Sequence, residues 1–409
     1  MKQRITIVAT AVLTVAVLLL LPNGCVSEFN AELPIKEDDI LVVSGDIIEN
    51  TEVDFVLSKS FSINSANPPA ESQNVVATVT VVGSDGYQSS PATPMGKGVY
   101  RLAIGELKDD VAYGLRIGYY GNTYTSQPST PLRTPEIDEI SLAQPEEYGD
   151  VSLQVSTHDD TSSEPRYFIW NYQEDWEFPA WKYTRLYVHQ LSQNLIIIDT
   201  VNYNYKYVCW KKNTVNELLI GTTEMLTENR LVNKELLNYP SGDERFRSLY
   251  CLTLTQKAIS KEAYEYYKIK KTENEEMGGV FTPQPSETKG NIACQTDPSK
   301  RTIGYVSVVK NVVRKRIFVK DGEVTKRMID SGCPLLSQNE AVAQQNALGY
   351  KTLEEFLLVQ GMEPVGDWEW VTPQKIGMVI DGYTQKRCVD CTLAGGTKNK
   401  PDFWPNDKE

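Results

Sequence analysis

The sequence predicts a mainly β protein: an N-terminal immunoglobulin-like β-sandwich, a second β-rich domain with an inserted helix, and a small helical, cysteine-containing C-terminal segment. Short runs of β-branched and aromatic residues, bounded by Gly, Pro, Asp and Asn, recur from about residue 39 to residue 330. Helix-capping patterns dominate after residue 331. About 385 residues remain without the leader described next, which is more than one core usually serves, so we expect several domains.

Residues 1–24 have the features of an export signal. Lys2 and Arg4 supply positive charge, and a long apolar run follows from Ile5 to Leu21. Gly24 then precedes Cys25, the small residue and thiol that a lipoprotein signal peptidase requires. The leucine stands one position further from the cysteine than is usual for this motif.

We therefore predict cleavage after residue 24, a lipid anchor on Cys25 and a polar tether over residues 25–38. The alternative is a transmembrane anchor, because the apolar run approaches the length needed to span a bilayer. The immediate cysteine, without a basic cluster after the run, favours the lipid anchor.

Residues 39–135 are predicted to form the first sandwich. Three strand-like runs, Ile40–Ile48, Val75–Val82 and Gly98–Ile104, are rich in β-branched residues. Tyr119–Thr125 resembles a hairpin, since its central Gly-Asn pair tolerates a positive φ. Strands at this spacing without helices between them favour an immunoglobulin-like sandwich.

Residues 136–330 are predicted to form the second β-rich domain, after a proline-punctuated joint. Its expected strands are Val151–Val155, Arg166–Tyr172, Tyr183–Val188, Tyr203–Trp210, Phe246–Thr255, Gly304–Val309 and Arg316–Val319. A helix is expected over residues 261–276, because Ser260 can cap its start and Gly278 and Gly279 can end it. We expect Tyr264, Tyr267 and Ile269 to dock this helix on the sheet.

Residues 331–409 are predicted to be helical and then loop-rich. Ser337–Glu340 and Thr352–Glu355 both have the capping-box form, with Gly349 and Gly361 as helix stops. The tail that follows carries Cys388 and Cys391.

Six cysteines remain once Cys25 is lipidated, and an even number in an exported chain favours disulfides. They are Cys209, Cys251, Cys294, Cys333, Cys388 and Cys391. A zinc site at Cys388-x-x-Cys391 would need two further ligands nearby, and a redox dithiol usually opens a helix, which Thr-Leu-Ala-Gly-Gly-Thr does not favour. We predict a structural disulfide element, and the spacing does not decide its pairing.

The charge and the motif content exclude several function classes. The net charge of −13, or −15 without the leader, argues against a nucleic-acid partner. The two histidines, His158 and His189, have no metal-ligand spacing, and no nucleophile elbow, phosphate loop or dinucleotide fingerprint occurs. We expect no catalytic residue, metal or cofactor, although a hydrolase using two carboxylates stays open as a minor alternative.

Aromatic residues gather in Asp175–Lys182, which we expect to be a loop between strands. Its Trp176 and Trp181 are the candidate ligand contacts, because exposed rings stack on sugars or meet a protein partner. The alternative is that these rings belong to the core.

Several stretches together resemble a known family, the Bacteroidetes outer-membrane lipoproteins termed domain of unknown function 4249. The matching stretches are Tyr250–Tyr267, Phe281–Cys294, Asp297-Pro298, Gly304–Val306 and Cys391–Pro405, and the lipobox and N-terminal β domain agree in position. The resemblance implies a lipid-anchored outer-membrane protein at the cell surface, encoded beside TonB-dependent transporters and without an established activity.

The resemblance also implies pairings and a role. Cys209–Cys294 is the first disulfide it suggests, and Cys333 with Cys388 or Cys391 is the second. Cys251 would then pair with the remaining cysteine of the Cys388-x-x-Cys391 element or stay free. The expected function is that of a non-enzymatic accessory partner of a TonB-dependent transporter in nutrient capture. The alternative is a stand-alone glycan-binding or adhesion lipoprotein.

Overall fold

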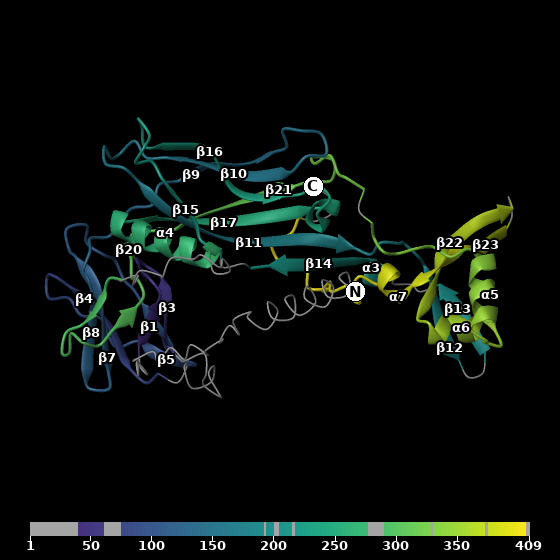
Figure 1. Ribbon diagram of the computed structural model, residues 1–409, viewed down its shortest axis with the longest axis horizontal. Coiled ribbons are helices and arrows are strands. Elements are labelled where there is room, and N and C mark those ends of the chain that lie inside the picture. Colours follow the sequence, from purple (N-terminus) through teal and green to yellow (C-terminus); the bar gives the residue numbers. More distant parts are fainter. Residues whose placement is uncertain are drawn as a thin grey trace, which may run out of the picture. The chain divides into compact units, whose positions relative to one another are not determined.

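The chain is mainly β, as predicted, and strands are the commonest secondary structure in the computed structural model (Figure 1). The structure describes residues 40–60, 75–191, 194–199, 204–214, 217–276, 290–328, 330–372 and 375–405. Among these residues, no helix combines the length and the apolar character needed to cross a membrane. The leader, Cys25 and the tether lie outside the described residues.

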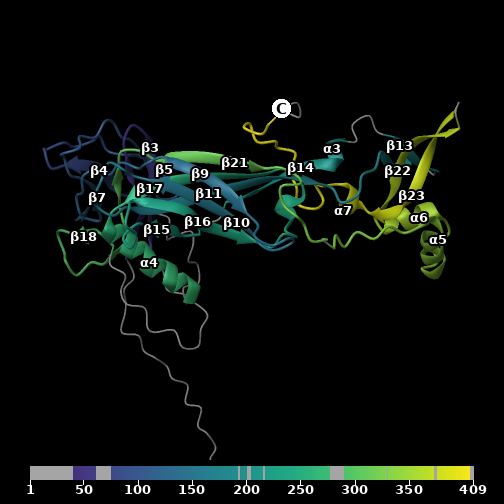
Figure 2. The same ribbon diagram turned by 90° about the horizontal axis from the view of Figure 1, so that it is seen from above.

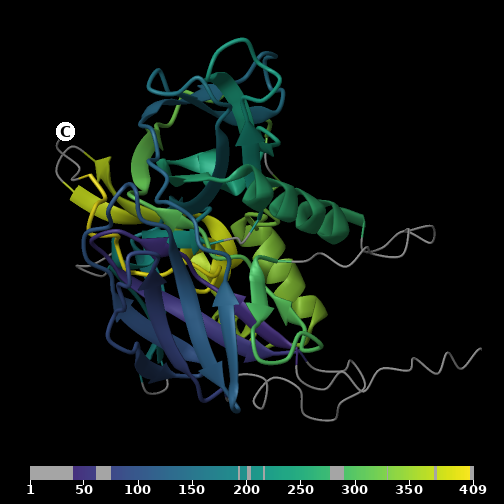
Figure 3. The same cartoon turned by 90° about the vertical axis from the view of Figure 1, so that its left-hand side faces the viewer.

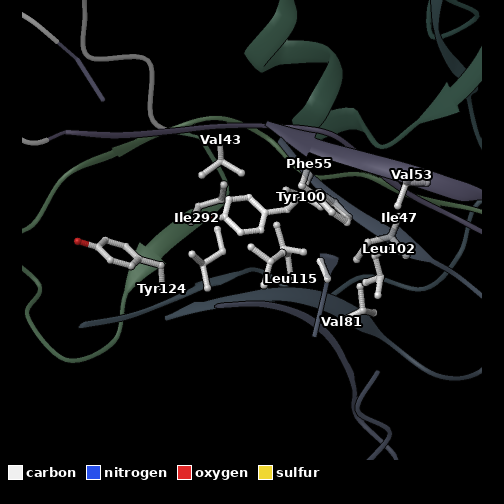
Figure 4. Packing of buried hydrophobic residues seen from close by; sticks show 14 of the residues in the cluster. Val43, Ile47, Val53, Phe55, Val81, Tyr100, Leu102, Leu115, Tyr124 and Ile292 are labelled. Atoms are coloured by element: carbon white, nitrogen blue, oxygen red, sulfur yellow. The ribbon is translucent and has the colours of Figure 1, made fainter. Parts of the chain in front are cut away.

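The first sandwich consists of two sheets with strand orders β19-β1-β3-β6-β5 and β18-β8-β7-β4. The strands of the first sheet are β1 (Leu41–Ser44), β3 (Glu52–Lys59), β5 (Thr93–Gly96), β6 (Val99–Ala103) and β19 (Thr302–Ile303). Those of the second are β4 (Thr78–Gly83), β7 (Tyr113–Tyr119), β8 (Asn122–Ser126) and β18 (Ile292–Cys294). In β3, buried Phe55 alternates with exposed Asp54, and Phe55 and Tyr100 pack with Leu115 between the sheets (Figure 4).

The chain returns to this sandwich after residue 290, which corrects the predicted domain boundaries. β18 pairs with β8, and β19 pairs in parallel with β1. Further along, β20 (Val308–Val309) pairs in parallel with β2 (Ile47–Ile48). Residues 290–309 were predicted within the second domain, but their strands complete the first one. A local strand pattern does not carry the identity of a distant partner strand.

The second β region packs two further sheets, with strand orders β16-β10-β9 and β14-β11-β17-β21. Their strands are β9 (Ile137–Ala143), β10 (Val151–His158), β11 (Tyr167–Pro179), β14 (Val208–Asn213), β15 (Leu219–Thr222, on β11), β16 (Arg230–Tyr239), β17 (Tyr250–Ile259) and β21 (Val313–Val319). Trp170, Leu153 and Leu252 share the core between the sheets. The strand expected from Tyr203 begins only at Val208, because α3 (Asn204–Tyr207) precedes it.

The helix predicted over residues 261–276 is confirmed as α4 (Lys261–Glu276), which lies beside the second β region (Figures 2 and 3). Ser260 caps it, since its hydroxyl oxygen accepts the Ala263 N–H at 3.2 Å. Tyr264 and Tyr267 pack with Ile169 of β11, whereas Ile269 is exposed and does not dock the helix. The two glycines expected to end the helix lie outside the described residues.

Two partly buried ion pairs hold the segment after β1, and one of them joins it to the second β region. Asp46 pairs with Lys257 of β17 and also accepts the Ser307 N–H at 2.9 Å. Glu49 lies 3.1 Å from the Lys310 ammonium and accepts the Leu107 N–H at 2.7 Å. Because each carboxylate is both paired and hydrogen-bonded, its burial is compensated, and the loop after β1 is fixed to the neighbouring elements.

The C-terminal segment contains both predicted helices, α5 (Gln338–Ala347) and α6 (Leu353–Val359). The capping box of α5 is complete, but Glu355 accepts the N–H of Lys351 instead of Thr352, so the second box is only half formed. Gly349 and Gly361 follow the helices with φ of +79° and +63°, as their stop role requires. Two hairpins and two short helical turns complete the described elements. The hairpins are β12 (Leu186–Leu191) with β13 (Asn194–Asp199) and β22 (Met362–Thr372) with β23 (Lys375–Gln385), and the helical turns are η1 (Glu244–Arg247) and α7 (Lys386–Val389).

A substitution at Gly304 tests whether the stability of the protein depends on the close approach of the returning segment to β1. Its φ is +140°, and a Cβ added there would lie 2.1 Å from the Val43 carbonyl oxygen. We expect Gly304→Ala to lower the free energy of unfolding by at least about 2 kcal/mol, from backbone strain and the clash together. Urea denaturation measures the free energy of unfolding. Gly105→Ala is the control, because no atom lies within 4 Å of a Cβ added at Gly105. Equal stability of the two variants would contradict the close approach.

Candidate functional site

Trp176 lies in a strand and not in the predicted loop. β11 continues through Pro179, pairing Trp176 with Tyr250 of β17 on one side and Lys211 of β14 on the other. The Trp176 side chain is only 6% exposed. The loop prediction was therefore wrong for this residue, and Trp176 belongs to the core instead of a ligand-binding surface.

Beside Trp176 lies a buried polar network centred on Glu174, which is 0% exposed. The Tyr250 hydroxyl donates to Glu174 Oε1 at 2.8 Å, and Asn213 Nδ2 donates to Oε2 at 2.9 Å. Arg245 Nε lies 3.3 Å from Oε1, so the charge of the carboxylate is balanced. The counter-charge and the hydrogen bonds to both oxygens compensate for the cost of burying the carboxylate.

The network holds the surrounding phenols in their neutral form. Burial, and then the proximity of Glu174, raises the pKa of both Tyr239 and Tyr250. Burial and neighbouring Glu217 raise the pKa of Tyr172 to about 12. Burial alone would lower the pKa of Arg245, but Glu174 and Asp243 outweigh it and raise that pKa. The network is thus a set of neutral hydrogen-bond donors around one ion pair, which stabilises the buried charge of Glu174 inside the core.

Trp181 is half-buried and stacks with a cation. The Arg247 guanidinium carbon lies 3.4 Å from the Trp181 ring centroid and 5.6 Å from that of Phe178. Lys211 Nζ lies 3.6 Å from the same Phe178 centroid. Burial lowers the pKa of Arg247, whose Nη1 is buried without a hydrogen-bond partner in the described part of the chain. These cation–π contacts lie within the protein and stabilise this corner of it, and Trp181 is the partly exposed aromatic ring of the cluster, since Phe178 is only 2% exposed.

Four of the cysteines form two disulfides, and one predicted pairing is wrong. Cys209 pairs with Cys391, and Cys333 pairs with Cys388, with Cα–Cα distances of 5.8 and 5.7 Å. The Cys333–Cys388 alternative is therefore confirmed, as is the disulfide role of the Cys-x-x-Cys element. Cys209–Cys294 is excluded because Cys209 lies on β14, whereas β18 carries Cys294 back to the first sandwich, where it stays buried and free.

The segment after Cys391 is fastened to β14. Trp210 and Thr397 exchange two backbone hydrogen bonds of 2.8 Å each. A Cβ added at Gly396 would lie 2.5 Å from the Cys209 Cβ, so this position requires glycine for close approach. Gly395, with a φ of +87°, makes the preceding turn.

The end of the tail covers the outer face of β17 and β21. Phe403 lies under the Arg316 guanidinium at 3.5 Å, and Trp404 meets Phe318 edge-on at 5.7 Å between centroids. Phe318 is the cross-strand neighbour of Cys251, the second buried free cysteine. The Phe403-Trp404 pair thus holds the end of the tail against the second β region.

His158 lies between two carboxylates at the end of a strand. His158 ends β10, with Nδ1 2.7 Å from Asp138 and Nε2 3.6 Å from Asp160. His189 lies in β12, where the side chain is outside the description. No group of three or more potential metal ligands comes together among the described residues.

Comparison with protein families matches residues 26–315 to "Domain of unknown function (DUF4249)". The chain belongs to this family. Comparison with curated proteins found no match. The family match begins directly after Cys25 and ends within β21, so the Cys209–Cys391 disulfide joins the matched range to a tail that lies beyond it.

The two tryptophans should differ sharply in their contribution to stability. Trp176→Ala removes a core ring, and we expect it to lower the free energy of unfolding by about 3–5 kcal/mol. Trp181→Ala removes a half-buried ring and one cation contact, and we expect a loss of about 1–2 kcal/mol. Urea unfolding followed by circular dichroism measures both. A Trp176 variant no less stable than the Trp181 variant would contradict the core assignment.

The thiol of Cys251 should report on tail docking. Burial raises its pKa to about 12, and alkylation requires the thiolate, so wild-type protein should resist iodoacetamide at pH 8. We expect Trp404→Ala to raise the rate of Cys251 labelling at least about tenfold by uncovering β21. Peptide mapping separates this site from Cys294. Leu393→Ala is the control, because this tail residue is exposed; an unchanged rate in Trp404→Ala would refute the role of the tail as a cover.

Proposed function

We propose that this protein is an outer-membrane lipoprotein, anchored through Cys25 at the cell surface, that acts without catalysis as an accessory partner of a TonB-dependent transporter in nutrient capture. The observation that carries the proposal is the leader ending at Gly24-Cys25, read with the two disulfides. Disulfides persist in oxidising compartments outside the cytoplasm, which agrees with export. The resemblance to Bacteroidetes lipoproteins encoded beside such transporters supports the choice of partner.

The buried carboxylate of Glu174 is not a candidate for acid–base catalysis. A catalytic acid or base needs a carboxylate oxygen that reaches the substrate. Both oxygens of Glu174 already accept hydrogen bonds, from Tyr250 and Asn213, inside the core. Of the two tryptophans proposed as ligand contacts, Trp181 is the one that is not buried in the core, and it stacks with Arg247.

The anchor and the partner are testable in the native bacterium. Cells fed a clickable palmitate analogue should label the wild-type chain, and Cys25→Ser should abolish both the label and the membrane association. A C-terminally tagged wild-type chain, cross-linked on intact cells and extracted in detergent, should recover a TonB-dependent transporter. Cys25→Ser provides the matched control for recovery that depends on anchoring.

Two results would overturn the proposal. An unlabelled wild-type chain would remove the lipid anchor. Repeated recovery of the labelled lipoprotein alone would remove the transporter partnership and favour the second candidate, a stand-alone glycan-binding or adhesion lipoprotein.

A further inference from the structure

An open hollow of about 470 Å³ lies on the outer face of the sheet formed by β9, β10 and β16. Leu153 and Val155 of β10 turn into the core, so their neighbours Ser152 and Gln154 face outward and line the hollow. The adjoining strand β16 contributes Glu235 and Asn238.

The lining combines uncompensated acceptors with donors. Glu146, Asp150 and Glu235 line the hollow, and none of them forms an ion pair with another described residue. Arg327 is the single cation of the lining. Ser152 is only 6% exposed and accepts a hydrogen bond from Gln154 at 3.0 Å, while no described residue accepts its hydroxyl proton.

The loop beside the hollow is held rigidly from two sides. The Gln144 amide donates to the carbonyls of Gly149 at 3.0 Å and Thr325 at 2.9 Å, and its oxygen accepts the Thr325 N–H at 2.9 Å. Tyr148 donates its N–H to Thr325 Oγ1 at 3.0 Å. The Tyr148 carbonyl accepts from Ser241 and from Arg327, each at 2.8 Å.

These bonds hold Tyr148 in a conformation that tyrosine rarely adopts. Its φ is +61°, the residue is 47% exposed, and it directly precedes Gly149 of the lining. Such strain persists only where the surroundings over-determine it, and it gathers at ligand-binding sites. Because this loop is already ordered beside the hollow, it would lose little conformational entropy when a ligand binds.

We propose that this hollow binds a neutral oligosaccharide, which rests on the proposed role in nutrient capture and names its ligand class. Sugar hydroxyls both donate and accept, so they match carboxylates, amides and a guanidinium in one site. Tyr148 is not itself part of the lining, but it directly precedes Gly149, and an aromatic side chain at the edge of a site can pack against the C–H face of a sugar. Three unpaired carboxylates against one Arg327 disfavour an anionic ligand, and the described residues contain no group of potential ligands for a metal ion.

Isothermal titration of the full-length protein, in a detergent without a sugar head group, tests the assignment. The probes are malto-, manno- and xylo-hexaose, with trigalacturonate as the anionic comparison. We expect at least one neutral probe to bind, and Glu235→Gln and Asn238→Ala each to weaken it at least about tenfold. Neither side chain has a described hydrogen bond to lose. Glu139→Gln, an exposed carboxylate on β9 outside the hollow, is the matched control and should leave the affinity unchanged.

The ring of Tyr148 is tested separately. Tyr148→Asn removes the ring while tolerating a positive φ, and should weaken binding, whereas Tyr148→Phe should retain it. Absence of binding to every neutral probe, binding of trigalacturonate alone, or wild-type affinity in Glu235→Gln and Asn238→Ala would each overturn the proposal. Transporter recovery from cells is scored independently, so failure of the hollow and failure of the partnership are distinguishable.

Discussion

The pairing of β11 with β17 is the constraint on which most of the structure depends. The two strands stay in register from Tyr167 opposite Ile259 to Trp176 opposite Tyr250. Because side chains alternate across a strand, this one register decides which residues enter the core beneath β10 and which meet α4. A slip by one residue would turn Trp170 out of the core and bring the α4-facing side chains into it.

The same register places Glu174 inside the protein, and the neighbouring elements must compensate for its charge. Arg245 supplies the counter-charge from η1, while Asn213 and Tyr250 supply hydrogen bonds from the two adjoining strands. Since the carboxylate is fully engaged, its chemistry serves the fold. The groups still able to bind something lie on the opposite face of β10, where Ser152 and Gln154 point away from the core.

Two distant segments close the structure, and both depend on a backbone approaching too closely for a side chain. Gly304 allows the returning segment to pass β1, and Gly396 allows the tail to pass Cys209. Closing such long loops costs chain entropy, which local contacts cannot offset. The Cys209–Cys391 disulfide, with a sequence separation of 182, removes much of that entropy from the unfolded chain.

The sequence by itself determined the β class, the existence and starts of α4, α5 and α6, and the disulfide role of the terminal cysteines. Capping at Ser260 and Ser337 is a hydrogen bond spanning three residues, so local sequence contains it. Only the tertiary structure decided that residues 290–309 rejoin the first sandwich, that Trp176 is core, that Cys209 meets Cys391, and that a hollow forms on β10 and β16. Each depends on which distant strands pair and in what register, and a strand pattern of period two is the same for every possible partner.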